Sequence, residues 1–236
     1  MLTVVKKRLE EKFEEFMSTV RIEEVTDRNL DEKVQEFLKD RPVKESGEQS
    51  VEIIFSPPED DIYTVEGGRT PYDLLISGKV RETSFKIFLN NKEGNLHSSA
   101  RNDTTTYNNL LRLYAGITTQ RATKVVVDKE IILRRVEGKE VVSYGIFVVD
   151  KNRREFNFFL LEEVAENFYV NPRNSMFQVR YCPSLRSRPL GYYDFVLKLI
   201  DASTEALSKA INKAKTEILT LEALREIITE VKINGG

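Results

Sequence analysis

Two neighbouring apolar segments decide the fold, PYDLLISGKV at residues 71–80 and TSFKIFL at residues 83–89. Their aliphatic and aromatic residues predict two adjacent strands, at residues 72–76 and 80–89. Ser77-Gly78-Lys79 lies between them and predicts a hairpin turn, because glycine accepts the positive φ that such turns need. Asp73 opens the first strand, and Lys86 lies within the second.

Lys86 is the least expected residue of these strands, because a buried ammonium is costly unless something anionic meets it. Strand alternation places Glu82, Ser84 and Lys86 on one face. If Asp73 lies at the neighbouring strand end, Asp73 and Glu82 can share a divalent cation, with Lys86 beside an attacking water. Oxygen-only ligation suits Mg²⁺, which completes its shell with water and substrate phosphate. The alternative is structural: a buried ion pair, or a lysine that extends along a sheet edge.

These residues resemble the PD-(D/E)xK nuclease superfamily, and in particular the blunt-cutting type II restriction endonucleases. Pro71 and Asp73 match the first motif with one inserted residue, and Ser84-Phe85-Lys86 matches the second only at the lysine. The resemblance implies a restriction-endonuclease-like domain. It also implies Asp73 as a metal ligand, Lys86 as the residue that orients water, and the carbonyl of Phe85 as a further ligand.

Ser84 departs from the family pattern, which usually has Asp or Glu at this position. A metal site loses charge and affinity without that carboxylate, so another acid must replace it for catalysis. The candidates are Glu82 on the same face, Glu66 upstream and Glu93 downstream, and geometry favours Glu82. If no acid is supplied, the fold binds DNA without cutting it.

Composition excludes several other classes of protein. The chain has 236 residues, of which 40% are hydrophobic and 31% charged, which is typical of a globular protein. No apolar run approaches the roughly 18 residues of a membrane span, and no signal-peptide core is present, so we expect a cytoplasmic protein without membrane contact. The single cysteine, Cys182, and the single histidine, His97, exclude an internal disulfide, zinc enzymes and Ser–His–Asp hydrolases.

Charge is unevenly distributed along the chain. Residues 1–72 carry 11 basic and 18 acidic side chains, whereas residues 77–135 carry 11 basic and 5 acidic ones. Residues 171–190 add four arginines and no acid. This distribution is compatible with a local positive surface for a polyanion and, equally, with chance clustering on solvated faces.

The rest of the chain predicts helices and strands around the hairpin. Apolar periodicity predicts helices at residues 3–20 and 30–39, at 110–114 and 158–167, and across the C-terminal third in one or two pieces. Further strands are predicted at residues 51–55, 125–127, 131–135, 141–149 and 176–181, with a turn at 137–139. Residues 42–49, the acidic turn 57–61 and residues 90–109 are predicted to be polar connections.

This order of elements predicts a three-layer α/β domain, with a central mixed sheet flanked by helices. We expect one domain over residues 1–236. It would comprise N-terminal helices (1–42), a core for catalysis and DNA binding (48–190) and C-terminal helices (191–236).

Two polar segments are candidates for DNA contact, because Asn and Arg read base edges and hydroxyl groups reach phosphates. The first follows Lys86 closely, and the second places unopposed arginines on both sides of a strand. The alternatives are a solvated loop with a helix cap and an ordinary basic surface. The candidates are Arg101, Asn102, Asp103, Thr104, Thr105, Tyr107, Asn108, Asn109, Arg173, Asn174, Arg186 and Arg188.

The leading hypothesis is a Mg²⁺-dependent type II restriction endonuclease that hydrolyses duplex DNA at a short specific site. A palindromic site favours a two-fold homodimer, with the N-terminal or C-terminal amphipathic helices as its surface. One alternative is a catalytically impaired DNA-binding protein with a nuclease fold. A structure-specific repair or recombination nuclease is the other.

Overall fold

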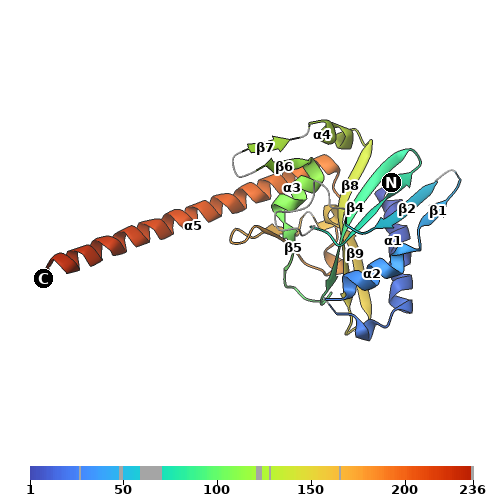
Figure 1. Cartoon of the computed structure of the whole chain (residues 1–236), viewed down its shortest axis with the longest axis horizontal. Helices are drawn as coiled ribbons and strands as arrows, with labels where there is room; N and C mark the ends of the chain where they lie inside the picture. The colour runs from blue at the N-terminus through green and yellow to red at the C-terminus, as the bar shows by residue number, and fades with distance from the viewer. Residues whose placement is uncertain are drawn as a thin grey trace.

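The structure, a computed structural model, describes residues 1–26, 28–47, 50–58, 71–120, 124–127, 129–164 and 166–234; side chains are described throughout except at residues 117–120, 124–127 and 226–234. A six-stranded sheet lies at its centre, in the order β1-β2-β3-β4-β8-β9 (Figure 1). The strands are β1 (Val43–Glu45), β2 (Val51–Ser56), β3 (Leu74–Val80), β4 (Thr83–Glu93), β8 (Glu140–Asp150) and β9 (Glu155–Leu160). The sheet is mixed, because β4 and β8 run parallel and the other neighbours run antiparallel.

The central hairpin joins β3 and β4, but its turn differs from the expected one. The register runs from Leu74 opposite Leu89 to Val80 opposite Thr83, so the turn is Arg81-Glu82, and Arg81 has φ 55. Gly78 lies inside β3, where a Cβ would collide with the carbonyl oxygen of Glu52 on β2. The glycine therefore serves a close approach between strands instead of a turn.

Helices α1 (Leu2–Thr19) and α2 (Leu30–Lys39) cover one face of the sheet, close to the expected bounds. Their apolar stripes pack on the side chains that β3, β4 and β8 send to that face. The ring of Phe13 on α1 stacks on Phe147 of β8 with 4.1 Å between centroids. Such aromatic contacts add to the apolar burial that holds the layer in place.

The opposite face is covered by α3 (Tyr107–Ala115) and by the first turns of α5 (Tyr192–Asn234). Gly116 ends α3 in the left-handed conformation, which glycine adopts without steric cost. The rings of Tyr114 and Phe195 lie 4.9 Å apart and join the two helices. The α/β class and the arrangement of helices on both faces of a mixed sheet are therefore confirmed.

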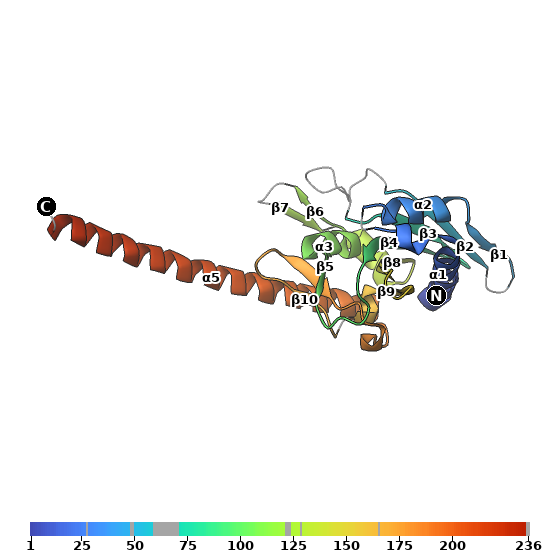
Figure 2. The same cartoon turned by 90° about the horizontal axis from the view of Figure 1, so that it is seen from below.

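Smaller elements complete the chain. A three-stranded sheet has the order β10-β11-β5, and a second hairpin pairs β6 with β7. Helix α5 is 43 residues long and extends away from the rest of the molecule (Figures 1 and 2). The remaining bounds are β5 (Asn102–Thr106), β6 (Ile117–Gln120), β7 (Lys124–Val127), α4 (Lys129–Val136), β10 (Tyr169–Val170) and β11 (Met176–Val179).

Several sequence predictions were wrong because tertiary pairing overrode local pattern. The segment 158–167 is not a helix: β9 continues to Leu160 beside β8, and a short 3-10 turn follows at Leu161–Val164. The segment 131–135 is part of α4, whose Arg135 donates to the C-terminal carbonyls of α3. The connection 42–49 contains β1, and the loop 90–109 contains the end of β4 and all of β5.

A buried polar cluster follows the end of β9, where β8 loses its neighbour. The Tyr114 hydroxyl accepts the Tyr144 N–H (2.8 Å) in place of a strand carbonyl, and it donates to Glu162. Glu162 also accepts from the Ser143 hydroxyl at 2.7 Å and is 4% exposed. Burial raises its pKa to about 7.

No helix among the described residues is both long and apolar enough to cross a membrane. Residues 59–61 of the expected acidic turn lie outside the described residues.

Candidate active site at the Asp73 end of the central hairpin

Asp73 directly precedes β3, at the end of the hairpin opposite to its turn. Its backbone N–H donates to the carbonyl of Leu89 at 2.7 Å. Its side-chain Oδ2 accepts the backbone N–H of Asn91, also at 2.7 Å. The Asp73 carboxyl group thus accepts a backbone N–H of β4 in place of a strand carbonyl, just before β3 begins. This contact fixes the position of the carboxyl group.

Helix α2 brings a second carboxyl group to the same place. Asp31 lies in the first turn of α2, and its Oδ1 accepts from the side-chain amide of Asn91 at 3.1 Å. Gln35, one turn further along, donates to the carbonyl of Asp73 at 2.7 Å. Helix α2 thus positions Asp31 beside the start of β3.

The electrostatics of this pair differ from those of exposed carboxylates. The pKa of Asp73 is raised to about 7, first by burial and then by the negative charge of Asp31. The Asn91 N–H and the ammonium of Lys92 act in the opposite direction and lower it. Two carboxyl groups that cannot easily both be ionised are stabilised by a shared proton or by a cation.

Two buried amide oxygens beside the carboxyl pair lack a donor. Asn90 donates through Nδ2 to the Tyr144 hydroxyl (2.9 Å), which donates in turn to the carbonyl of Pro71 (2.7 Å). Because that hydroxyl can only accept from Asn90, the amide orientation is determined. The Oδ1 atoms of Asn90 and Asn91 then remain buried without a hydrogen-bond partner. An unsatisfied buried acceptor costs roughly 1–3 kcal/mol, which a bound cation would offset.

The available ligands are therefore all oxygens, which suits a hard cation such as Mg²⁺. They comprise the carboxylates of Asp31 and Asp73 and one amide oxygen. Asn90 and Asn91 are neighbours on β4, so their side chains leave opposite faces of the sheet: the Asn91 amide contacts Asp31 on the α2 face, and the Asn90 amide contacts Tyr144 on the other. Within the part of the chain that the structure describes, no three acidic, histidine or cysteine side chains gather as a metal-binding group. The donor set thus fits a cation with two carboxylates, with an amide oxygen in place of a third.

Lys92 is the lysine that lies near Asp73, and its contribution was not expected. It follows Asn90 by two positions on β4, and its charge lowers the pKa of Asp73. The signal was present in the sequence, because Asn90-Asn91-Lys92 has the spacing of an acid-x-lysine motif with asparagine in place of the acid. It was missed because the strand was expected to end at residue 89.

The structure does not bring the expected catalytic residues together. Lys86 lies opposite Ser77, so four residues of β4, or about 13 Å, separate it from Asn90. Glu82 is in the turn, about 26 Å along the strand from Asn90, so it cannot share an ion with Asp73. The physical reason is that the turn lies further along the chain than expected.

The other expected ligands also lie away from Asp73 or outside the described residues. Ser84 faces Lys79 near the turn, and its hydroxyl approaches the carbonyl of Lys139 at 3.5 Å. Phe85 pairs with Gly78 inside the sheet. Glu93 forms an ion pair with Lys151 at 2.7 Å. Glu66 lies outside the described residues.

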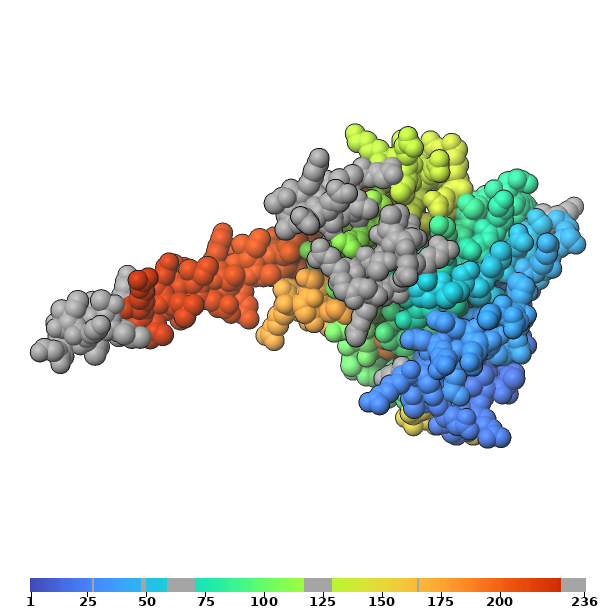
Figure 3. Space-filling model, in the orientation of Figure 1, coloured from blue at the N-terminus to red at the C-terminus, as the bar shows by residue number. Residues whose placement is uncertain are grey.

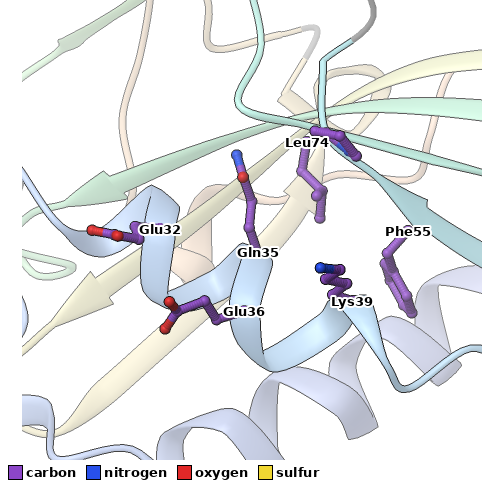
Figure 4. Close-up of a pocket in the computed structure, with 7 residues that line it drawn as sticks. Glu32, Gln35, Glu36, Lys39, Phe55 and Leu74 are labelled. Atoms are coloured by element: carbon purple, nitrogen blue, oxygen red, sulfur yellow. The ribbon is translucent and has the colours of Figure 1, made fainter.

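A cavity of about 280 Å³ borders this site on the α2 side (Figure 4). It lies between α2 and the strands β2 and β3, and Gln35 and Leu74 connect it to Asp73. The remainder is lined by Glu32, Glu36, Lys39, Phe55 and Pro57. The cavity leaves space next to the carboxyl pair.

Comparison with known proteins identifies the class of the chain. It is 50% identical over 233 residues to the Type II restriction enzyme MjaIV of Methanocaldococcus jannaschii, an alignment that covers 98% of this chain and 94% of that protein. The chain belongs to the type II restriction enzymes. These enzymes are site-specific deoxyribonucleases. No protein-family model matches the restriction enzyme described here.

The first candidate DNA-binding segment of the restriction enzyme divides into structural and exposed residues. Thr104, Thr105 and Tyr107 are buried; the Thr104 hydroxyl donates to the carbonyl of Phe177 at 2.8 Å. Asn109 donates through its backbone N–H to Thr106 at 3.3 Å and through its amide to Thr105 at 3.0 Å, as part of a helix cap. These residues form the end of β5 and the start of α3, where their polar groups are used within the fold.

Other residues of this segment remain accessible. Arg101, Asp103 and Asn108 are exposed, and Asn102 is half-buried. Arg101 lies over the ring of Tyr169 at 5.0 Å, and Asp103 accepts from Gln178. Thr105 acts to lower the pKa of the Tyr144 hydroxyl, so this segment lies close to the residue that holds Asn90.

The second segment divides in the same way. Arg173 and Asn174, in the turn between β10 and β11, and Arg188 are exposed. Arg186 instead stacks on Phe159 at 3.5 Å and donates to the carbonyls of Arg180 and Tyr181. Burial lowers its pKa to about 10. Arg186 therefore braces the chain after β11, and the expectation that it contacts DNA is not supported.

Proposed function

We propose that this restriction enzyme hydrolyses phosphodiester bonds of duplex DNA at a short specific site, with Mg²⁺ held by Asp31 and Asp73. The amide oxygen of Asn91, which shares the α2 face with Asp31, completes the protein's share of the ligands. The observation that carries the proposal is the buried carboxyl pair, with a raised pKa at Asp73, beside an amide oxygen that has no donor. A cation resolves both anomalies at once.

Each protein group has a distinct role in this proposal. A bound Mg²⁺ neutralises charge at the phosphate and lowers the pKa of a bound water. Asn91 holds the Asp73 carboxylate in place through its backbone N–H. Lys92, and not Lys86, supplies the positive charge next to the attacked phosphate. Tyr144 holds Asn90 and the carbonyl of Pro71 in fixed positions.

The arrangement supports assignment to the PD-(D/E)xK superfamily and to a restriction-endonuclease-like fold. An aspartate precedes one strand of a hairpin, an Asn-x-Lys sequence ends the other, and helices cover both faces of a mixed sheet. The exposed residues Arg101, Asn108, Arg173, Asn174 and Arg188 are candidate DNA contacts. A palindromic site requires two active sites in opposite orientations, which favours a homodimer.

Digestion of phage DNA with and without Mg²⁺ tests the proposal. Wild-type enzyme should give discrete bands that depend on Mg²⁺, and Asp73→Asn should give none. The amide oxygen introduced by this substitution can still accept the Asn91 N–H, so the variant isolates the lost charge. Bands from the wild type in the presence of a chelator, or from Asp73→Asn, would contradict the assignment.

One observation favours a second candidate function. The described site has two carboxylates, and asparagine stands where the motif has its second acid. A protein impaired in this way would bind a specific duplex without cutting it. Binding of the duplex without bands in any divalent ion would support this alternative, and Asn90→Asp should then restore cleavage.

A further inference from the structure

Helix α5 has two apolar faces, and only one of them is used by the described chain. Phe195, Leu199, Ser203 and Ala206 face the body of the molecule and are buried, at steps of three and four residues. A second stripe, rotated by about half a turn, stays exposed. Its large members are Tyr193, Leu197, Ile200, Leu207, Ile211, Ile218 and Leu221, which are 40–64% exposed.

The exposed stripe has the spacing of a coiled-coil seam. From Leu197 to Leu221 its steps alternate regularly between three and four residues, with Thr204 and Ala214 at the two positions not filled by a large apolar side chain. Such a heptad pattern predicts that another helix packs along this face. The stripe spans about 36 Å, which is more than three heptads.

Much of the stripe lies on the part of α5 that has little packing of its own, so a partner helix would stabilise it. Every residue from Leu207 to Arg225 except the half-buried Ala210 is exposed, and this part of α5 extends from the body (Figures 1 and 3). A long helix with little tertiary packing is only marginally stable in water. An apolar stripe of this length in solvent marks an interaction surface.

We propose that this face binds α5 of a second copy of the chain, antiparallel, with the two-fold axis near Lys209. The proposal deepens the proposed function, because two copies are what a palindromic duplex requires. In this register Leu197 meets the partner's Leu221 and Ile200 meets the partner's Ile218. Thr204 then lies against the small Ala214 of the partner.

The charges beside the stripe favour the antiparallel orientation over the parallel one. In the antiparallel register Asp201 lies beside Lys215 of the partner subunit, an attractive pair that occurs twice and offsets the repulsion between Asp194 and the partner's Glu222. At the axis Ser208 and Ala210 each meet their own copies. A parallel, in-register pair would instead place Glu217 beside the partner's Glu222, twice, and like charges at these positions are unfavourable.

Light scattering of the purified full chain tests the partner without DNA or Mg²⁺. At about 10 μM, wild type should have the mass of two chains. Ile211→Glu combined with Ile218→Glu should have the mass of one, because two charges then enter the seam. Leu219→Glu is the matched control: it is 65% exposed but lies off the stripe, and it should keep two chains.

Cysteine cross-linking tests the orientation. In a Cys182→Ser background, Ser208→Cys should form an intermolecular disulfide at least about tenfold faster than Leu207→Cys. Of these two positions, 208 meets its own copy beside an antiparallel seam and 207 does not. A faster cross-link at position 207 would overturn the antiparallel arrangement. A single-chain wild type, or an unchanged mass in the double variant, would overturn the interface. These results do not depend on cleavage, so they stand or fall separately from the proposed function.

Discussion

Replacing each lysine of β4 in a separate variant distinguishes the site seen in the structure, which includes Lys92, from the site expected from the motif, which includes Lys86. The perturbations are Lys92→Met and Lys86→Met, which remove the charge and keep an unbranched apolar side chain. Both lysines lie on the same strand, separated by six positions, so each variant controls for the other. We expect Lys92→Met to lose cleavage and Lys86→Met to retain it.

The magnitude follows from distance and screening. At about 13 Å through water, the charge of Lys86 interacts with one at the Asp73 end by only about 0.3 kcal/mol. Lys92 acts to lower the pKa of the largely buried Asp73, so its charge is felt at this end of the hairpin. Removal of one group that stabilises transition-state charge typically slows a reaction by about 100-fold or more, which is the loss expected for Lys92→Met, whereas the loss of Lys86 changes the rate less than about twofold.

Single-turnover cleavage of a short duplex that contains the site measures this difference. Enzyme in excess of DNA reports the chemical step, and duplex binding with Ca²⁺ in place of Mg²⁺ verifies that the substrate still binds. Circular dichroism confirms that both variants fold. Equal losses in the two variants, or a loss confined to Lys86→Met, would refute the assignment of Lys92.

Three further predictions follow from the buried polar groups. Asp31→Asn removes the charge that raises the pKa of Asp73, so that pKa should fall in a ¹³C-carboxyl titration, and the Mg²⁺ concentration for half-maximal cleavage should rise about tenfold or more. Glu162 keeps its proton in the folded protein up to about pH 7 but releases it near pH 4.5 when the protein is unfolded, so the free energy of unfolding should fall as pH rises through this window. Glu162→Gln should reduce this loss between pH 5 and 8 by about 3 kcal/mol, measured by guanidinium unfolding. A pH slope that is identical in the two proteins would contradict this. Tyr144→Phe keeps the ring but leaves Asn90 and the Pro71 carbonyl without their partner. The free energy of unfolding should therefore fall by about 1–3 kcal/mol, and the Mg²⁺ concentration needed for cleavage should rise. An unchanged Mg²⁺ requirement would limit Tyr144 to a structural role.

The elements that were predicted well carry a local signal. The helices α1 and α2 have apolar stripes with helical spacing, and Gly116 ends α3 as a C-terminal glycine should. Strand β8 could be predicted because nearly all of it is apolar, as expected for a strand buried on both faces. The segment 158–167 was misassigned because its apolar run fits a helix as well as a strand, and only the pairing with β8 decides between them.

The site was predicted in part, and the error has one cause. The position of Asp73 at the start of a strand was predicted correctly, but glycine at position 78 suggested a turn three residues too early. A turn at the wrong place shifts every later residue relative to Asp73, so Lys86 and Glu82 were expected where Asn90 and Lys92 lie. Hydrophobic pattern alone could not correct this, because a collision between Gly78 and β2 depends on a strand remote in sequence.

The position of Asp73 outside the regular ladder explains why the polar groups gather at this end of the hairpin. Within β3 and β4 the backbone donors and acceptors satisfy one another, so the carboxyl of Asp73 can accept the Asn91 N–H only where regular pairing ends. The first turns of α2 meet that same place through Asp31 and Gln35, and Tyr144 on β8 meets it through Asn90 and the carbonyl of Pro71. Three elements, the hairpin, α2 and β8, therefore position these polar groups together, so a change that removes a contact from any one of them should alter the Mg²⁺ requirement.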